Sequence, residues 1–109
     1  MKWEKRVLLI AAPGEQDPLL QQQRRIMRRW TAAAAERDLA VVEIVGNDVT
    51  GASDTSASLR ERFRLPRDGF SALLIGKDGG TKLRRTHPIA AADLEETIDA
   101  MPMRRQERH

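Results

Sequence analysis

The chain contains no cysteine among its 109 residues. A protein without thiols cannot form disulfides, hold a metal through thiolates or use a cysteine nucleophile. Composition therefore excludes thiol redox and thiol peroxidase chemistry, whatever the fold. The two histidines, His87 and His109, are too few and too far apart in the chain to predict a metal site. We expect neither a metal nor another cofactor.

Aromatic residues and long hydrophobic runs are also scarce. Aromatic side chains make up 4% of the chain, although proteins that stack nucleic-acid bases need exposed aromatic rings. No apolar run approaches the roughly 18 residues that cross a bilayer. The N-terminal stretch MKWEK lacks the apolar core of a signal peptide. We therefore expect no membrane partner, and the compartment stays open.

The excess of positive charge is small. Lysine and arginine total 19 residues against 16 aspartates and glutamates, which gives a net charge of +3. Such a balance is weak support for a nucleic-acid partner, which would call for a strongly basic surface. Nucleic acid is therefore the less favoured of the possible partners.

The patterning predicts one α/β domain, residues 1–103, followed by a flexible basic tail, residues 104–109. Residues 5–12 and 39–45 are continuous apolar runs, which are typical of strands that are buried on both faces. A helical pattern of roughly twenty residues separates the two runs, so we expect a βαβ unit with parallel strands.

The helix of this unit has clear signals in the sequence. Asp17 offers an N-cap carboxylate, and Pro18 suits the first helical position, where its missing N–H costs nothing. Apolar residues from Leu19 to Ala34 recur on one stripe, while the glutamines and arginines largely point away from it. We expect a single helix that ends near Arg37.

The middle of the chain predicts a loop and a short helix. Residues 47–56 are polar and rich in turn-forming residues, as loops are. Ser58 and Glu61 stand three apart, which matches a capping box at a helix start. Pro66 then stops this helix.

The last part of the chain predicts a hairpin and a helix. Residues 70–77 form another apolar run, and Asp78-Gly79 is a strong hairpin signal into a charged second arm. Charge on that arm is typical of an edge strand. Residues 88–101 then carry a helical pattern. The predicted order is β-α-β-α-β-β-α, with a mixed four-stranded sheet and helices on both faces.

This order resembles the single-domain thioredoxin-like fold, and particular stretches strengthen the resemblance. LLIAAPGEQDP resembles the first thioredoxin strand entering the active-site helix, and LLIGKDGG resembles the third strand and its turn. GFSALLIGKDGGTKLRR followed by IDAMPMRRQE resembles an uncharacterised, peroxiredoxin-like domain family. That family occurs as stand-alone bacterial proteins and within vertebrate sushi-repeat and matrix proteins. The resemblance spans Trp3 to Glu107 and implies a thioredoxin-like fold without an established activity.

The resemblance also shows which reactive groups are missing. It places the two thiol positions of a thioredoxin at Glu15 and Pro18, and the position of its cis-proline at Ser71. The chain would thus keep the scaffold of a redox protein without its redox groups.

The junction of the first strand and helix is one candidate site. Glu15, Gln16 and Asp17 could bind a cation or serve a carboxylate- or metal-dependent enzyme, which predicts a strongly perturbed pKa in a cleft. The favoured alternative is structural, because acids stabilise a helix N-terminus by roughly 0.3–1 kcal/mol.

Two groups of arginines are candidate binding surfaces. The first lies on the exposed side of the first helix, with no acid on the same turn to offset it, and the second would form if the tail folds back along the edge strand. The groups are Arg24, Arg25, Arg28 and Arg29, and Arg84, Arg85, Arg104 and Arg105. Each group also has a structural alternative. The first can be an ordinary solvated helix face, and the second can protect the edge of the sheet from pairing with other molecules. The preferred hypothesis is a non-catalytic module that binds an acidic protein or polyanion, with weak nucleic-acid binding as an alternative.

Overall fold

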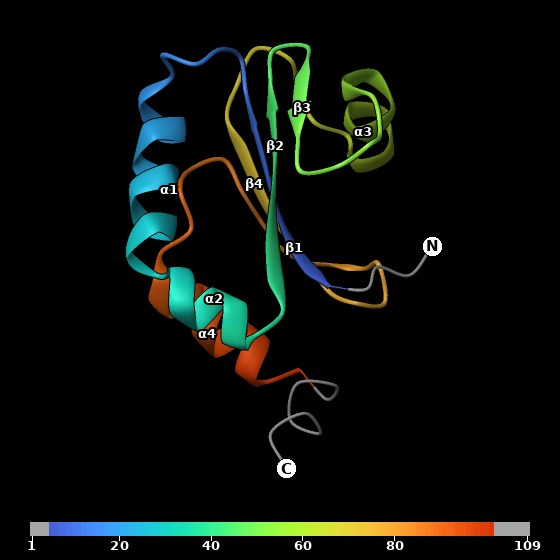
Figure 1. Ribbon diagram of the computed structural model, residues 1–109. Coiled ribbons are helices and arrows are strands. Elements are labelled where there is room, and N and C mark those ends of the chain that lie inside the picture. Colours follow the sequence, from blue (N-terminus) through green and yellow to red (C-terminus); the bar gives the residue numbers. More distant parts are fainter. Residues whose placement is uncertain (1–4, 102–109) are drawn as a thin grey trace.

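A mixed sheet of five strands forms the centre of the computed structural model, which describes residues 5–101 (Figure 1). The strand order across the sheet is β3-β2-β1-β4-β5. The strands are β1 (Arg6–Ala12), β2 (Leu39–Val45), β3 (Asp48–Thr50), β4 (Ser71–Ile75) and β5 (Thr81–Arg85).

The strand directions follow the sequence prediction. β1 runs parallel to β2, with Arg6 opposite Leu39 and Ala12 opposite Val45. β4 is antiparallel to β1, and β5 is antiparallel to β4. The parallel βαβ unit and the later hairpin are therefore confirmed.

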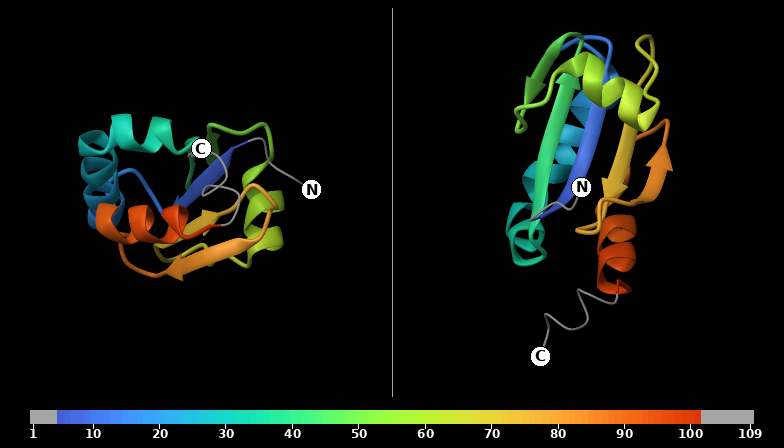
Figure 2. Two further views of the ribbon diagram at one scale, coloured as in Figure 1. Left: turned by 90° about the horizontal axis from the view of Figure 1, so that it is seen from below. Right: turned by 90° about the vertical axis from the view of Figure 1, so that its right-hand side faces the viewer.

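Helices cover both faces of the sheet (Figures 1 and 2). Leu8 and Ile10 of β1 point to a core shared with three of the helices, and Leu9 points to a core shared with the fourth. This alternation explains why β1 reads as a continuous apolar run. No helix in residues 5–101 is long and apolar enough to cross a membrane. The three helices on the Leu8 face are α1 (Pro18–Arg29), α2 (Thr31–Glu36) and α4 (Ala91–Asp99). The helix on the opposite face is α3 (Ser56–Phe63).

The expectation of a four-stranded sheet was wrong, because the predicted loop 47–56 contains β3. Val45 of β2 pairs with Asp48 of β3, so that Gly46 and Asn47 form a two-residue hairpin turn. Gly46 has a φ of +60°, a conformation that glycine adopts without strain. A Gly-Asn pair directly after a strand is a hairpin signal, and it explains the extra strand.

The single long helix was also wrong. The chain breaks between α1 and α2 at Trp30, where φ is −118° and ψ is 16°. The hydroxyl of Thr31 donates to the carbonyl oxygens of Met27 and Arg28, both at 3.1 Å, and so satisfies acceptors at the end of α1. The turn lets α2 leave the direction of α1, as Figure 1 shows.

Two helix starts differ from the prediction as well. Thr55, and not Ser58, is the N-cap of α3, because its Oγ1 accepts from the backbone N–H of Ser58 at 3.1 Å. The last helix begins three residues after Pro88, at Ala91, without a side-chain cap. The predicted tail, 104–109, falls beyond the part of the chain that the structure describes.

Candidate functional site

The junction between β1 and α1 holds three polar residues with separate structural environments. Asp17 Oδ1 accepts from the backbone N–H groups of Leu19 at 2.8 Å and Leu20 at 3.2 Å, which confirms the predicted N-cap. Gln16 is exposed. The carboxylate of Glu15 instead turns to Arg24, with Oε2 2.8 Å from Nη1 and Oε1 3.3 Å from Nη2.

This pairing decides what Glu15 can do chemically. The hydrogen bonds from Arg24 lower the pKa of Glu15 below its ordinary value. A general acid at neutral pH would need a raised pKa and a sheltered position, whereas the Glu15 side chain is 63% exposed. Within residues 5–101 no group of three or more histidines, aspartates or glutamates is arranged to hold a metal ion. The geometry therefore favours the structural interpretation of the junction.

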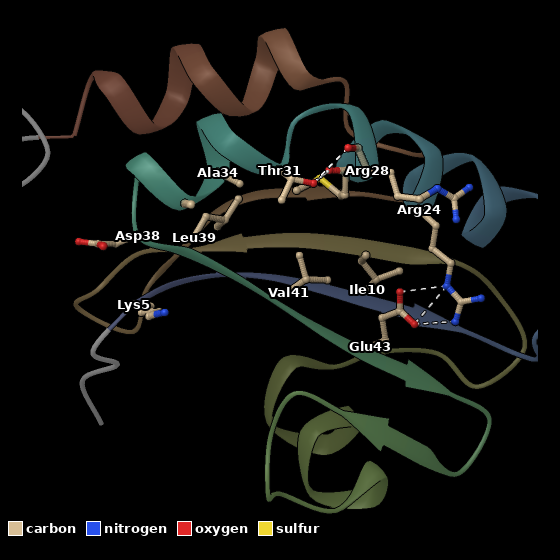
Figure 3. A pocket seen from close by; sticks show the side chains of 12 residues that line it. Lys5, Ile10, Arg24, Arg28, Thr31, Ala34, Asp38, Leu39, Val41 and Glu43 are labelled. Carbon is tan, nitrogen blue, oxygen red and sulfur yellow. Dashed lines mark hydrogen bonds and ion pairs between the residues drawn. The ribbon is translucent and has the colours of Figure 1, made fainter.

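Arg24 is the hub of an ion-pair network with Glu15 and Glu43. Figure 3 shows its pair with Glu43. Its Nε lies 3.0 Å from Glu43 Oε2, and its Nη2 lies 2.6 Å from Glu43 Oε1. Glu43, and then Glu15, raise the pKa of Arg24 through these hydrogen bonds. Arg24 thus donates these hydrogen bonds to carboxylates of the fold itself. The sequence had suggested that it would present its guanidinium group to a partner together with the other α1 arginines.

Sequence reasoning missed Glu43, the main partner of Arg24. Glu43 lies in the middle of β2, where its side chain faces α1 and is only 17% exposed. A charge in the apolar run LAVVEIV is costly unless it is paired, so its position was itself a signal. A basic residue on the covering helix was the natural partner to seek.

The other three arginines of α1 stay together at the surface. Arg25, Arg28 and Arg29 are exposed, and their spacing of three and four residues makes them neighbours on the helix. Among the described residues, none of the three has an ion-pair partner. We call these three residues the arginine surface.

The second predicted group is only partly described. Arg84 Nη2 donates to the carbonyl oxygen of Phe63, which ties the edge strand β5 to the end of α3. Arg85 is exposed, and its Nη1 donates to the carbonyl oxygen of Arg84 at 2.9 Å. Arg104 and Arg105 fall beyond residue 101, so their joining with the β5 arginines stays a prediction.

A further arginine lies at the carboxyl ends of the parallel strands, where α/β folds often bind ligands. Arg60 of α3 is 6% exposed, and its Nη2 donates to the carbonyl oxygens of Ala12 at 3.4 Å and Gly46 at 3.2 Å. Its Nη1 donates to Pro66 at 2.7 Å. Burial, and then the charge of Arg67, lower the pKa of Arg60. With its donors taken by neutral oxygens, Arg60 clamps the strand ends and does not offer an open anion site.

Comparison with known proteins gives one family match over nearly the whole chain and a partial match to a much longer relative. A family model described as "Domain of unknown function (DUF4174)" matches residues 1–107. Coiled-coil domain-containing protein 80 of Danio rerio is 29% identical over 128 residues, covering 97% of this chain. The chain spans only 15% of the length of that relative. No solved structure matches the chain significantly.

Proposed function

Because this chain belongs to the family described as Domain of unknown function (DUF4174), we propose its role from geometry: it is a non-catalytic module that binds an acidic protein. The observation that carries the proposal is the arginine surface. Arg25, Arg28 and Arg29 present guanidinium groups on one side of α1, and the fold uses none of them in an ion pair within residues 5–101. Guanidinium groups recognise carboxylates through paired hydrogen bonds.

Helix stability alone explains the arginine surface poorly. Arg25 and Arg29 are four residues apart, and like charges at that spacing weaken a helix modestly. Arg28 and Arg29 lie in the last turn, where the helix dipole offsets part of this repulsion. Arg24, on the same helix, has two carboxylate partners from elsewhere in the fold. A partner that brings carboxylates to the remaining three would complete the same pattern.

We also propose that the scaffold is thioredoxin-like. Support comes from the central strands β2-β1-β4-β5, in which β1 and β2 are parallel and the β4–β5 hairpin is antiparallel to β1. The short strand β3 is then an addition at one edge. Without cysteine, such a scaffold would serve binding and not electron transfer.

The experiment is retention of the full chain on immobilised poly-L-glutamate at low ionic strength. The test variant is R25E/R28E/R29E, and the matched control is R62E/R64E/R67E, which changes three exposed arginines and the net charge equally. We expect the wild type and the control to be retained and released by salt, and the test variant to flow through.

Two results would overturn this proposal. Equal loss of retention in both triple variants would mean that net charge, and not the α1 surface, attracts the polymer. Stronger retention on double-stranded DNA than on poly-L-glutamate, with a steep salt dependence, would point to nucleic acid instead. Circular dichroism of both variants must first show the wild-type helix content, so that lost binding is not lost folding.

A further inference from the structure

A pocket of about 500 Å³ opens between the face of the sheet and the break between α1 and α2 (Figure 3). This size lies in the usual range of small-molecule sites, roughly 300–1,000 Å³. Side chains of β1 and β2 form its floor, and side chains of both helices form its wall. The floor contains Ile10, Leu39 and Val41, and the wall contains Met27, Thr31 and Ala34.

The sequence of α2 explains why this space is not filled. The helix reads TAAAAE, so the side chains that it brings over the sheet are mostly methyl groups. α1, with its larger side chains, already ends at Arg29. Val41 of β2 therefore remains only half-buried, although its neighbour on the other face, Val42, is 1% exposed. The result is an apolar floor on which Val41 stays partly exposed, while Ile10 and Leu39 are 1% and 8% exposed.

Five charged side chains line the pocket. Two of them, Lys5 at the Asp38 end and Arg28, have no ion-pair partner among residues 5–101. Glu43 is paired with Arg24, and Asp38 accepts from Lys77 Nζ at 3.0 Å. Arg24 and Arg28 lie at one end of the pocket, while Asp38 lies at the other (Figure 3). Arg28 has no ion-pair partner among residues 5–101. The apolar floor is thus bounded at one end by an uncompensated guanidinium group.

We propose that this pocket binds a small amphipathic carboxylate, with its apolar chain over the floor and its carboxylate at Arg28. From Leu39 to Glu43 the floor extends roughly 13 Å, at about 3.3 Å per strand residue. This length suits a medium-chain molecule better than a short acid. The apolar floor supplies the favourable burial, and the bidentate pairing at Arg28 selects a carboxylate over a neutral head group. The inference does not depend on the proposed acidic partner, with which it shares only Arg28.

The direct test is isothermal titration of the full chain with decanoate below its micelle concentration. We expect saturable binding to the wild type, with butyrate and decanol each binding at least tenfold more weakly. R28Q should weaken decanoate binding at least tenfold. R29Q is the matched control, because Arg29 is equally exposed and adjacent but does not line the pocket, and it should leave decanoate affinity unchanged.

A second measurement locates the ligand without relying on a variant. In methyl-resolved NMR, decanoate should shift the signals of Leu39, Val41 and Ile10, while Ile44 and Ile75 on the α3 face of the sheet should stay fixed. Absence of saturable binding, equal weakening by R28Q and R29Q, or shifts confined to the α3 face would each overturn the inference. Tighter binding of a short peptide than of decanoate would also overturn it.

Failure of this test and failure of the proposed function can be told apart. R29Q could lose retention on poly-L-glutamate and keep its decanoate affinity. This result would support both proposals, because the acidic-partner proposal needs Arg29 and the pocket proposal does not. Decanoate binding that persists in R28Q would remove the pocket proposal and leave the arginine surface intact.

Discussion

Gln23 joins α1 to the segment before α4, and replacing it with leucine should destabilise the fold strongly. The side chain is 0% exposed. Its Nε2 donates to the carbonyl oxygen of Ile89 at 3.0 Å, and its Oε1 accepts from the N–H of Ile89 at 2.7 Å. The backbone N–H and C=O of Ile89 thus both have their hydrogen-bond partner in a side chain 66 positions earlier in the chain.

The expected size follows from these two hydrogen bonds. Gln23→Leu keeps the shape of the side chain but leaves one buried donor and one buried acceptor without their partner. Each unsatisfied group costs about 1–3 kcal/mol, and the gain from burying a more apolar side chain returns part of this. We therefore expect the free energy of unfolding to fall by about 2–4 kcal/mol. The melting temperature should fall by roughly 10–20 °C for a domain of this size.

Urea denaturation measures this loss, and the chain offers a matched control. Gln22 precedes Gln23 on the same helix but is exposed, so Gln22→Leu makes the same chemical change without breaking the contact with Ile89. The control should stay within about 0.5 kcal/mol of the wild type. A Gln23→Leu protein within the same margin would refute the reasoning, because water or a shifted backbone would then satisfy Ile89. Hydrogen exchange at the Ile89 amide gives a local check, since it should accelerate in Gln23→Leu only.

Three further predictions concern other parts of the fold. Arg37→Met should cost about 2 kcal/mol in urea denaturation, since the bidentate pair with Asp99 is lost but that carboxylate keeps some solvent. Gly51→Ala should cost more than about 1 kcal/mol, because its φ is +93° and the new Cβ would lie 2.5 Å from a β2 carbonyl oxygen. Arg24→Gln should raise the pKa of Glu15 in an NMR titration. A carboxyl with a depressed pKa contributes stability above its unfolded pKa and loses it as the pH falls through the folded pKa, so this contribution of Glu15 should vanish in the variant.

Each of these has a control or a contrary outcome. Arg25→Met changes an exposed arginine that has no ion-pair partner among residues 5–101, so it should be nearly neutral. An Arg37→Met protein as stable as the wild type would mean that the contact between Arg37 and α4 does not stabilise the fold. Gly69→Ala meets no atom within 4 Å, so it should be tolerated where Gly51→Ala is not. An unchanged pKa of Glu15 in Arg24→Gln would show that the pair seen here does not persist in solution.

The parts of the fold that local sequence could predict are those in which local pattern and burial agree. β1 and β2 are apolar on both faces because helices cover both sides, so their runs stand out without knowledge of the fold. β3 has only three residues and exposed ends, and its pairing with β2 depends on the turn at Gly46 more than on its own composition. The break at Trp30 was hidden because alanine-rich α2 continues the helical pattern of α1.

The candidate site was harder to predict, since its partners come from distant segments. Arg24 and Glu43 are 19 residues apart and meet only because the βαβ crossover lays α1 over β2. Sequence spacing along one helix could show that Arg24 has no acid nearby, but not that a strand supplies one. Gln23 likewise meets Ile89 only in the folded chain. Contacts of this kind follow from topology and not from periodicity.

The arginine content is a poor measure of binding in this protein, because several guanidinium groups hold the fold together. Arg60 clamps the carboxyl ends of two strands, Arg37 ties α2 to α4, and Arg6 in β1 donates to the carbonyl oxygen of Arg37 at 2.8 Å. A planar group with five donors can bridge several oxygens in this way, which a lysine cannot. A binding arginine is therefore recognised by donors that the fold leaves unused. Arg24 has the carboxylates of Glu15 and Glu43 as partners, whereas Arg25, Arg28 and Arg29 have no carboxylate partner among residues 5–101. A ligand that binds these three arginines must therefore supply the carboxylates itself.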